Sequence, residues 1–78
     1  MERQLMLLKK LIDIGTDVIR GCPAEVIAGI DRGLLALILV DLCCRYEAGI
    51  INNDEVLRLA RMHWAIAALD VMRRGERP

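Results

Sequence analysis

The chain has 78 residues, which is enough for a single domain over residues 1–78, with a core that is marginal unless a partner, metal or disulfide supports it. Hydrophobic residues make up 55% of the chain, yet only Tyr46 and Trp64 are aromatic, so the apolar mass is Leu, Ile, Val, Ala and Met. The eleven basic and eleven acidic residues balance, which argues against a nucleic-acid-binding protein because such proteins usually carry a basic excess.

The start of the chain does not resemble a signal peptide, because the apolar stretch 5–8 is followed at once by Lys9 and Lys10. The uncharged run 33–40 is far shorter than the ~20 apolar residues that span a bilayer. We therefore expect a cytoplasmic or host-intracellular protein with no membrane segment.

The first predicted helix covers residues 2–20 and is amphipathic. At about 100° per residue its apolar side chains gather on one half of the helical wheel, and its charged residues on the other. The apolar half holds Leu5, Leu7, Leu8, Leu11, Ile12, Ile14, Val18 and Ile19. Gly21 suits the position that ends the helix.

The second predicted helix begins at Pro23 and runs towards Ala48, with Gly29 and Gly33 inside it. Each glycine weakens a helix by roughly 1 kcal/mol relative to alanine. We expect either a kink or break near these glycines, or a close helix contact there. The stretch 33–44 carries Asp41 as its single charged residue and is apolar all round, so this helix should be covered on every side.

The third predicted helix begins with the clearest local signal in the chain. Asn52 as N-cap and Glu55 three residues later form a capping box, and Ile51 and Val56 suit a hydrophobic staple across it. The helix runs to about Arg74. Its first apolar stripe contains Val56, Leu57, Ala60, Trp64, Ala67, Ala68 and Val71, and its second stripe contains Leu59, Met62, Ile66 and Leu69. Two stripes indicate two neighbouring helices.

These elements predict an all-α fold, a three-helix antiparallel bundle whose central helix is open to being kinked or split near 29–33. The apolar helix surface exceeds what three helices cover among themselves, and such a surplus usually marks an interface. We therefore expect dimerisation, or a helical protein partner, to complete the bundle. The predicted interface residues are Leu35, Ile38, Leu39, Leu42, Met62, Ile66 and Leu69.

Groups that carry chemistry are scarce in this sequence. Cys43 and Cys44 are adjacent, which is a poor spacing for one zinc ion, and Cys22 is distant; we expect all three to be buried and inert. His63 is the sole histidine, and the chain has no serine. We expect no catalytic, cofactor or metal site, and no enzyme activity.

The sequence therefore favours a small protein–protein interaction module, such as an adaptor, chaperone, inhibitor or antiactivator, that acts by burying apolar helix surface against a partner or itself. The alternative is a DNA-binding transcriptional regulator that contacts phosphates through Arg58, Arg61, Arg73 and Arg74 of the third helix. The balanced charge of that helix argues against the alternative.

Overall fold

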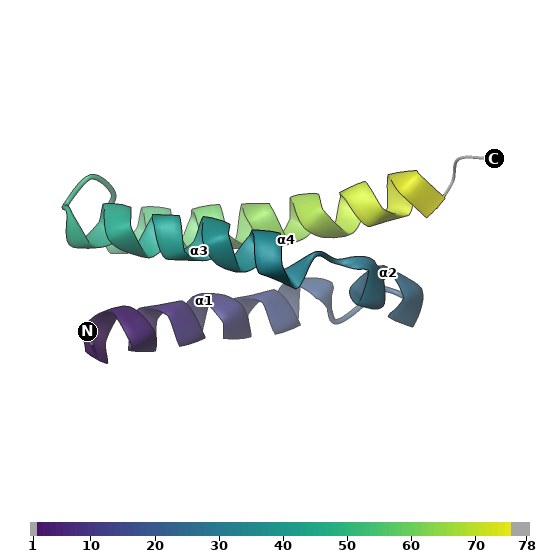
Figure 1. Ribbon diagram of the computed structural model, residues 1–78, viewed down its shortest axis with the longest axis horizontal. Coiled ribbons are helices and arrows are strands. Elements are labelled where there is room, and N and C mark those ends of the chain that lie inside the picture. The colour runs from purple at the N-terminus through teal and green to yellow at the C-terminus, as the bar shows by residue number, and fades with distance from the viewer. Residues whose placement is uncertain (1, 76–78) are drawn as a thin grey trace.

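The computed structural model describes the backbone of residues 2–75 and the side chains of residues 5–75. In this part of the chain every regular element is a helix: α1 (Glu2–Ile19), α2 (Ala24–Gly29), α3 (Arg32–Glu47) and α4 (Asn53–Gly75). Figure 1 shows α1, α3 and α4 side by side along the long axis of the molecule, with α2 at one end. The direction of α3 is opposite to that of α1 and α4.

The expected central helix is two helices, so the described chain has four helices rather than three. The break is at Ile30, whose backbone is extended, and at Asp31, whose carboxylate accepts a hydrogen bond of 3.0 Å from the Leu34 N–H and so caps α3. Gly29, the last residue of α2, lies close to α4, because a Cβ there would lie 2.7 Å from Cγ1 of Val71. The missing side chain therefore lets α2 lie directly against α4.

Two distant parts of the chain, α1 and α4, approach each other closely at Gly15. Leu11, Gly15 and Ile19 are buried at four-residue intervals along one face of α1. The Trp64 indole lies against Gly15, where a Cβ would overlap the ring, and its Nε1–H donates a buried hydrogen bond of 3.0 Å to the Leu11 carbonyl oxygen. A glycine on the buried face of α1 thus makes room for the single tryptophan of the chain.

The core lies between α1, α3 and α4 and is closed at one end by α2. Its buried members are Leu11, Ile19, Val26, Ile30, Leu35, Leu39, Leu42, Cys43, Val56, Ala60, Trp64 and Ala68. The core residues of α4 are spaced by four: Val56, Ala60, Trp64 and Ala68. All but Trp64 are small or of medium size, so α4 approaches its neighbours closely. These members belong to the first stripe predicted for the third helix.

The turn between α3 and α4 is tied at both ends. Gly49 adopts a φ of 76°, and the N–H groups of Gly49 and Ile50 donate to the carbonyls of Tyr46 and Arg45, which satisfies the end of α3. At the start of α4, the Asn52 Oδ1 accepts from the Glu55 N–H at 2.8 Å, and the Glu55 Oε1 accepts from the Asn52 N–H at 3.0 Å. The capping box predicted from the sequence is confirmed.

We expect Gly15→Ala to destabilise the fold by on the order of 2 kcal/mol or more, because overpacking against Trp64 outweighs the gain of about 1 kcal/mol in helix propensity. Gly33→Ala is the matched control, since the nearest atom to a Cβ there would be Oδ1 of Asp31, at an ordinary contact distance of 3.5 Å. The control should be neutral or stabilising by up to about 1 kcal/mol. Urea unfolding followed by circular dichroism measures both, and equal stability of the two variants would contradict the close approach.

We expect Asn52→Ala to lower the free energy of unfolding by about 1 kcal/mol, because it removes the acceptor for the Glu55 N–H. Asn53→Ala, one residue later and also exposed, should change the stability by less than about 0.5 kcal/mol. Thermal unfolding of the two variants under identical conditions tests the difference. A larger loss for Asn53→Ala would show that α4 is not capped at Asn52.

Candidate functional site

Three of the seven predicted interface residues are in the core. Leu35, Leu39 and Leu42 are buried in the core within one chain, so they are not exposed surface as the interface prediction implied; whether a partner contacts them stays untested. Because α3 is apolar all round, its sequence does not show which face points inward. Contacts with α1 and α4 determine that the face with Leu35, Leu39 and Leu42 points inward. A partner could reach these leucines only by opening the fold.

The three predicted interface residues of α4 face outward. Met62, Ile66 and Leu69 are 44%, 50% and 55% exposed, while Trp64 and Ala68 between them are buried. Leu59, the remaining member of the second stripe, is half-buried. At about 100° per residue the second stripe lies on the side of α4 away from Trp64. The structure thus largely separates the two stripes: the first builds the core, and Met62, Ile66 and Leu69 of the second are exposed, whereas Leu59 packs partly against the core.

A groove between α3 and α4 continues the apolar surface of the second stripe. It has a volume of about 250 Å³, and Leu34, Ile38 and Ile66 line it. Ile38, the seventh predicted interface residue, is half-buried there, and Leu34 is exposed. Ile38 and Ile66 thus line the same groove, and their role in an interface stays a prediction.

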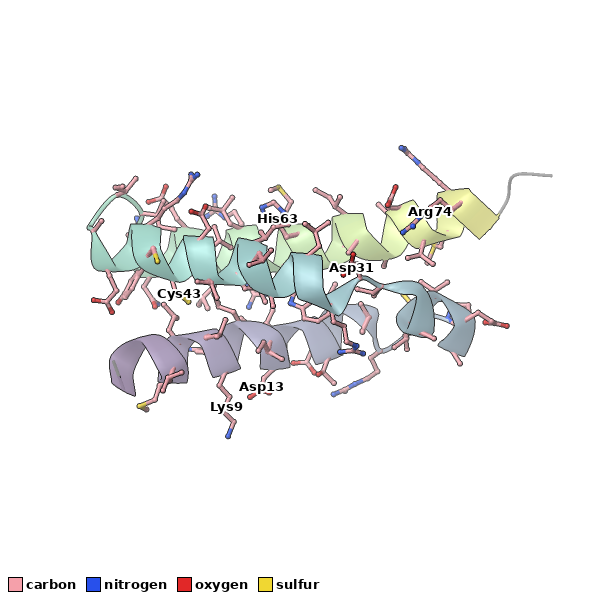
Figure 2. All side chains as sticks on the ribbon, in the orientation of Figure 1. Lys9, Asp13, Asp31, Cys43, His63 and Arg74 are labelled. Carbon is pink, nitrogen blue, oxygen red and sulfur yellow. The ribbon has the colours of Figure 1, made fainter. Side chains whose placement is uncertain are left out.

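Charged and polar groups form the rim of this groove. Asp31, His63, Asp70 and Arg74 also line the groove, and Arg74 pairs with Asp70 at 3.3 Å on the surface of α4. Figure 2 shows Asp31, His63 and Arg74 along the α3–α4 side of the molecule, whereas Lys9 and Asp13 extend from α1 on the opposite side. An apolar floor with a mixed-charge rim is the usual composition of a protein-binding surface.

Further apolar side chains are exposed outside the predicted interface residues. Leu34, Leu37 and Val40 lie on the outer side of α3, and Leu5 and Met6 lie near the start of α1. The one local signal at this helix is the N-cap Asp31, which indicates where α3 begins. It does not indicate which face of α3 is exposed. Leu34 and Leu37 emerge as exposed only once the packing partners of α3 are known.

The three cysteines occupy different environments. Cys43 is buried, as expected, but Cys44 is exposed and Cys22 is half-buried, so the expectation of three buried thiols is wrong for two of them. Burial, together with the neighbouring Cys44 and Glu47, raises the pKa of the Cys43 thiol above its usual value of 9.0. Within the described residues, no group of three or more His, Cys, Asp or Glu side chains could hold a metal ion.

The four arginines of the alternative, DNA-binding function are all exposed on α4. They do not share one face: at about 100° per residue, Arg61 and Arg74 point about 140° apart. Arg74 is also engaged with Asp70. Arg58, Arg61 and Arg73 fall within about 120° of one another, so Arg74 alone lies apart, and DNA binding stays an untested prediction.

No protein-family model, curated protein or solved structure is significantly similar to this chain. Among residues 2–75, no helix combines the length and the apolar character needed to cross a membrane.

We expect thiol reagents to modify Cys44 rapidly and Cys43 slowly at pH 8, because burial excludes the reagent from Cys43 and keeps its thiol protonated. Labelling of the Cys22→Ser/Cys44→Ser variant, which retains Cys43, measures this with a chromogenic disulfide. The reaction should be slow in buffer and immediate in denaturant. A rapid reaction of this variant in buffer would show that Cys43 is accessible.

Proposed function

We propose that this protein is a protein–protein interaction module whose outer α4 surface binds a partner helix. The observation that carries the proposal is the row of three half-exposed apolar side chains, Met62, Ile66 and Leu69, on one side of α4. Adaptors, chaperones, inhibitors and antiactivators all use such a surface, and the proposal covers this class. Dimerisation that completes a helical bundle is one form of it.

The energetic case rests on the size of the exposed side chains. Fully burying a Leu, Ile or Met side chain contributes about 1.5–3 kcal/mol, and these three are still about half exposed. A partner helix laid on the second stripe therefore gains roughly 2–5 kcal/mol from them, before it covers Leu34 and Ile38 in the groove. The rim of charged residues then selects among partners, because a mismatched charge there is left unpaired.

The other expectations from the sequence stay predictions: a cytoplasmic location, and no enzyme activity. Neither is needed for the proposal, which depends on the second stripe and the groove alone.

Site-specific photo-crosslinking in the native host tests the proposal. We expect a photoreactive residue in place of Ile66 to give a discrete adduct, because a bound helix would lie within reach of this position. The matched control is the same residue in place of Leu37, which is 70% exposed on the outer side of α3 and lies outside both stripe and groove.

The adduct at position 66 should disappear when Met62→Glu is added, because a charge in the second stripe opposes apolar packing. Mass spectrometry of the adduct identifies the partner. Equal adducts at positions 66 and 37, or none at position 66, would overturn the proposed function.

A further inference from the structure

The outward-facing residues of α4 are spaced alternately by four and three residues, as in a coiled coil. The second stripe extends in both directions with separations of four, three, four, three and four residues. Its complete series is Glu55, Leu59, Met62, Ile66, Leu69 and Arg73. This is the a/d pattern of a coiled-coil seam, with apolar residues in the middle and one charge of opposite sign at each end.

The two charges lie in line with the apolar residues. Glu55 and Arg73 are separated by eighteen residues, which is about five full turns, so they project in nearly the same direction about 27 Å apart. Both side chains are exposed. The capping box uses Oε1 of Glu55, and the Asp70 carboxylate engages Arg74 rather than Arg73. The seam therefore has a negative end and a positive end.

When two copies of α4 run antiparallel, the residues of this series match in size and in opposite charge. About a centre at position 64, Leu59 corresponds to Leu69, Met62 to Ile66, and Glu55 to Arg73. In antiparallel coiled coils an a residue of one helix packs with a d residue of the other, and these three correspondences are all of that kind. An isologous, two-fold symmetric contact requires this type of self-complementarity.

We propose that a second copy of this chain binds antiparallel along the second stripe, so that Glu55 faces the partner's Arg73 at both ends of the seam. This inference rests on the proposed function and names the partner of the same surface. A parallel pairing would place Glu55 against Glu55 and Arg73 against Arg73, and like charges disfavour it. The opposite face of α4 is filled by the core of its own chain, which leaves the second stripe as the seam.

Sedimentation equilibrium of the purified full chain tests this arrangement. We expect a dimer at micromolar concentration and a folded monomer for Leu69→Glu, whose dimer dissociation constant should rise by about a hundredfold or more. Leu69 is exposed within one chain, so circular dichroism of this variant should match that of the unmodified protein.

Charge reversals then test the orientation. Arg73→Glu places like charges at both ends of an antiparallel seam and should weaken the dimer about tenfold, whereas Glu55→Lys/Arg73→Glu should return it to within about threefold of the unmodified protein. Because Glu55→Lys also removes the acceptor for the Asn52 N–H, the single variant Glu55→Lys is measured beside it: it should weaken the dimer as Arg73→Glu does, with an unchanged circular dichroism spectrum. Arg61→Glu is the matched control, because it makes the same charge change on the same helix about 120° from the seam; it should alter the constant less than threefold.

A dimer that Arg73→Glu leaves unchanged would overturn the antiparallel register. A monomer at all micromolar concentrations would overturn the self-association altogether. The second result, together with a crosslink from position 66 to another protein, would leave the proposed function standing while this inference fails. No crosslink from position 66 would remove both.

Discussion

The position of α1 depends on the Trp64 indole, which lies on Gly15 and donates a hydrogen bond to the Leu11 carbonyl. An indole is a large apolar group with one obligatory donor, and both requirements are met here within one turn of α1. The contact brings the axes of α1 and α4 close together and aligns their faces. Leu11 and Ile19, which flank Gly15 on the same face of α1, are buried as a consequence.

Helix α4 has one buried side and one exposed side. On one side of α4, Trp64 and Ala68 face α1 and the core; on the other, Ile66 and Leu69 face water. Because Trp64 holds the inner side, the outer side is presented by a rigid helix rather than a loop. A rigid surface loses little conformational entropy on binding, which favours recognition by shape and charge pattern.

The sequence was sufficient for local features and insufficient for the choice of faces. The capping box at Asn52 and Glu55 lies within a few residues, so its pattern reports its structure directly. The buried face of α3 depends on contacts with α1 and α4, and the sequence of a helix that is apolar all round does not indicate which face these contacts cover. The sequence therefore predicts Leu39 at an interface, although it is buried in the core. Gly15 was informative in principle, since a glycine on an apolar face indicates a close approach, but its partner Trp64 is set by the tertiary fold.

The distance along the chain between Leu11 and Trp64 has a consequence for biosynthesis. They are 53 residues apart, and at about 5–20 residues per second a ribosome needs about 3 to 10 s to make the segment between them. Throughout that interval the apolar face of α1 has no tryptophan to cover it. Until Trp64 is available, Leu11 and Gly15 lack the side chain that covers them in the folded chain, so the contact between α1 and α4 forms late in synthesis or after it.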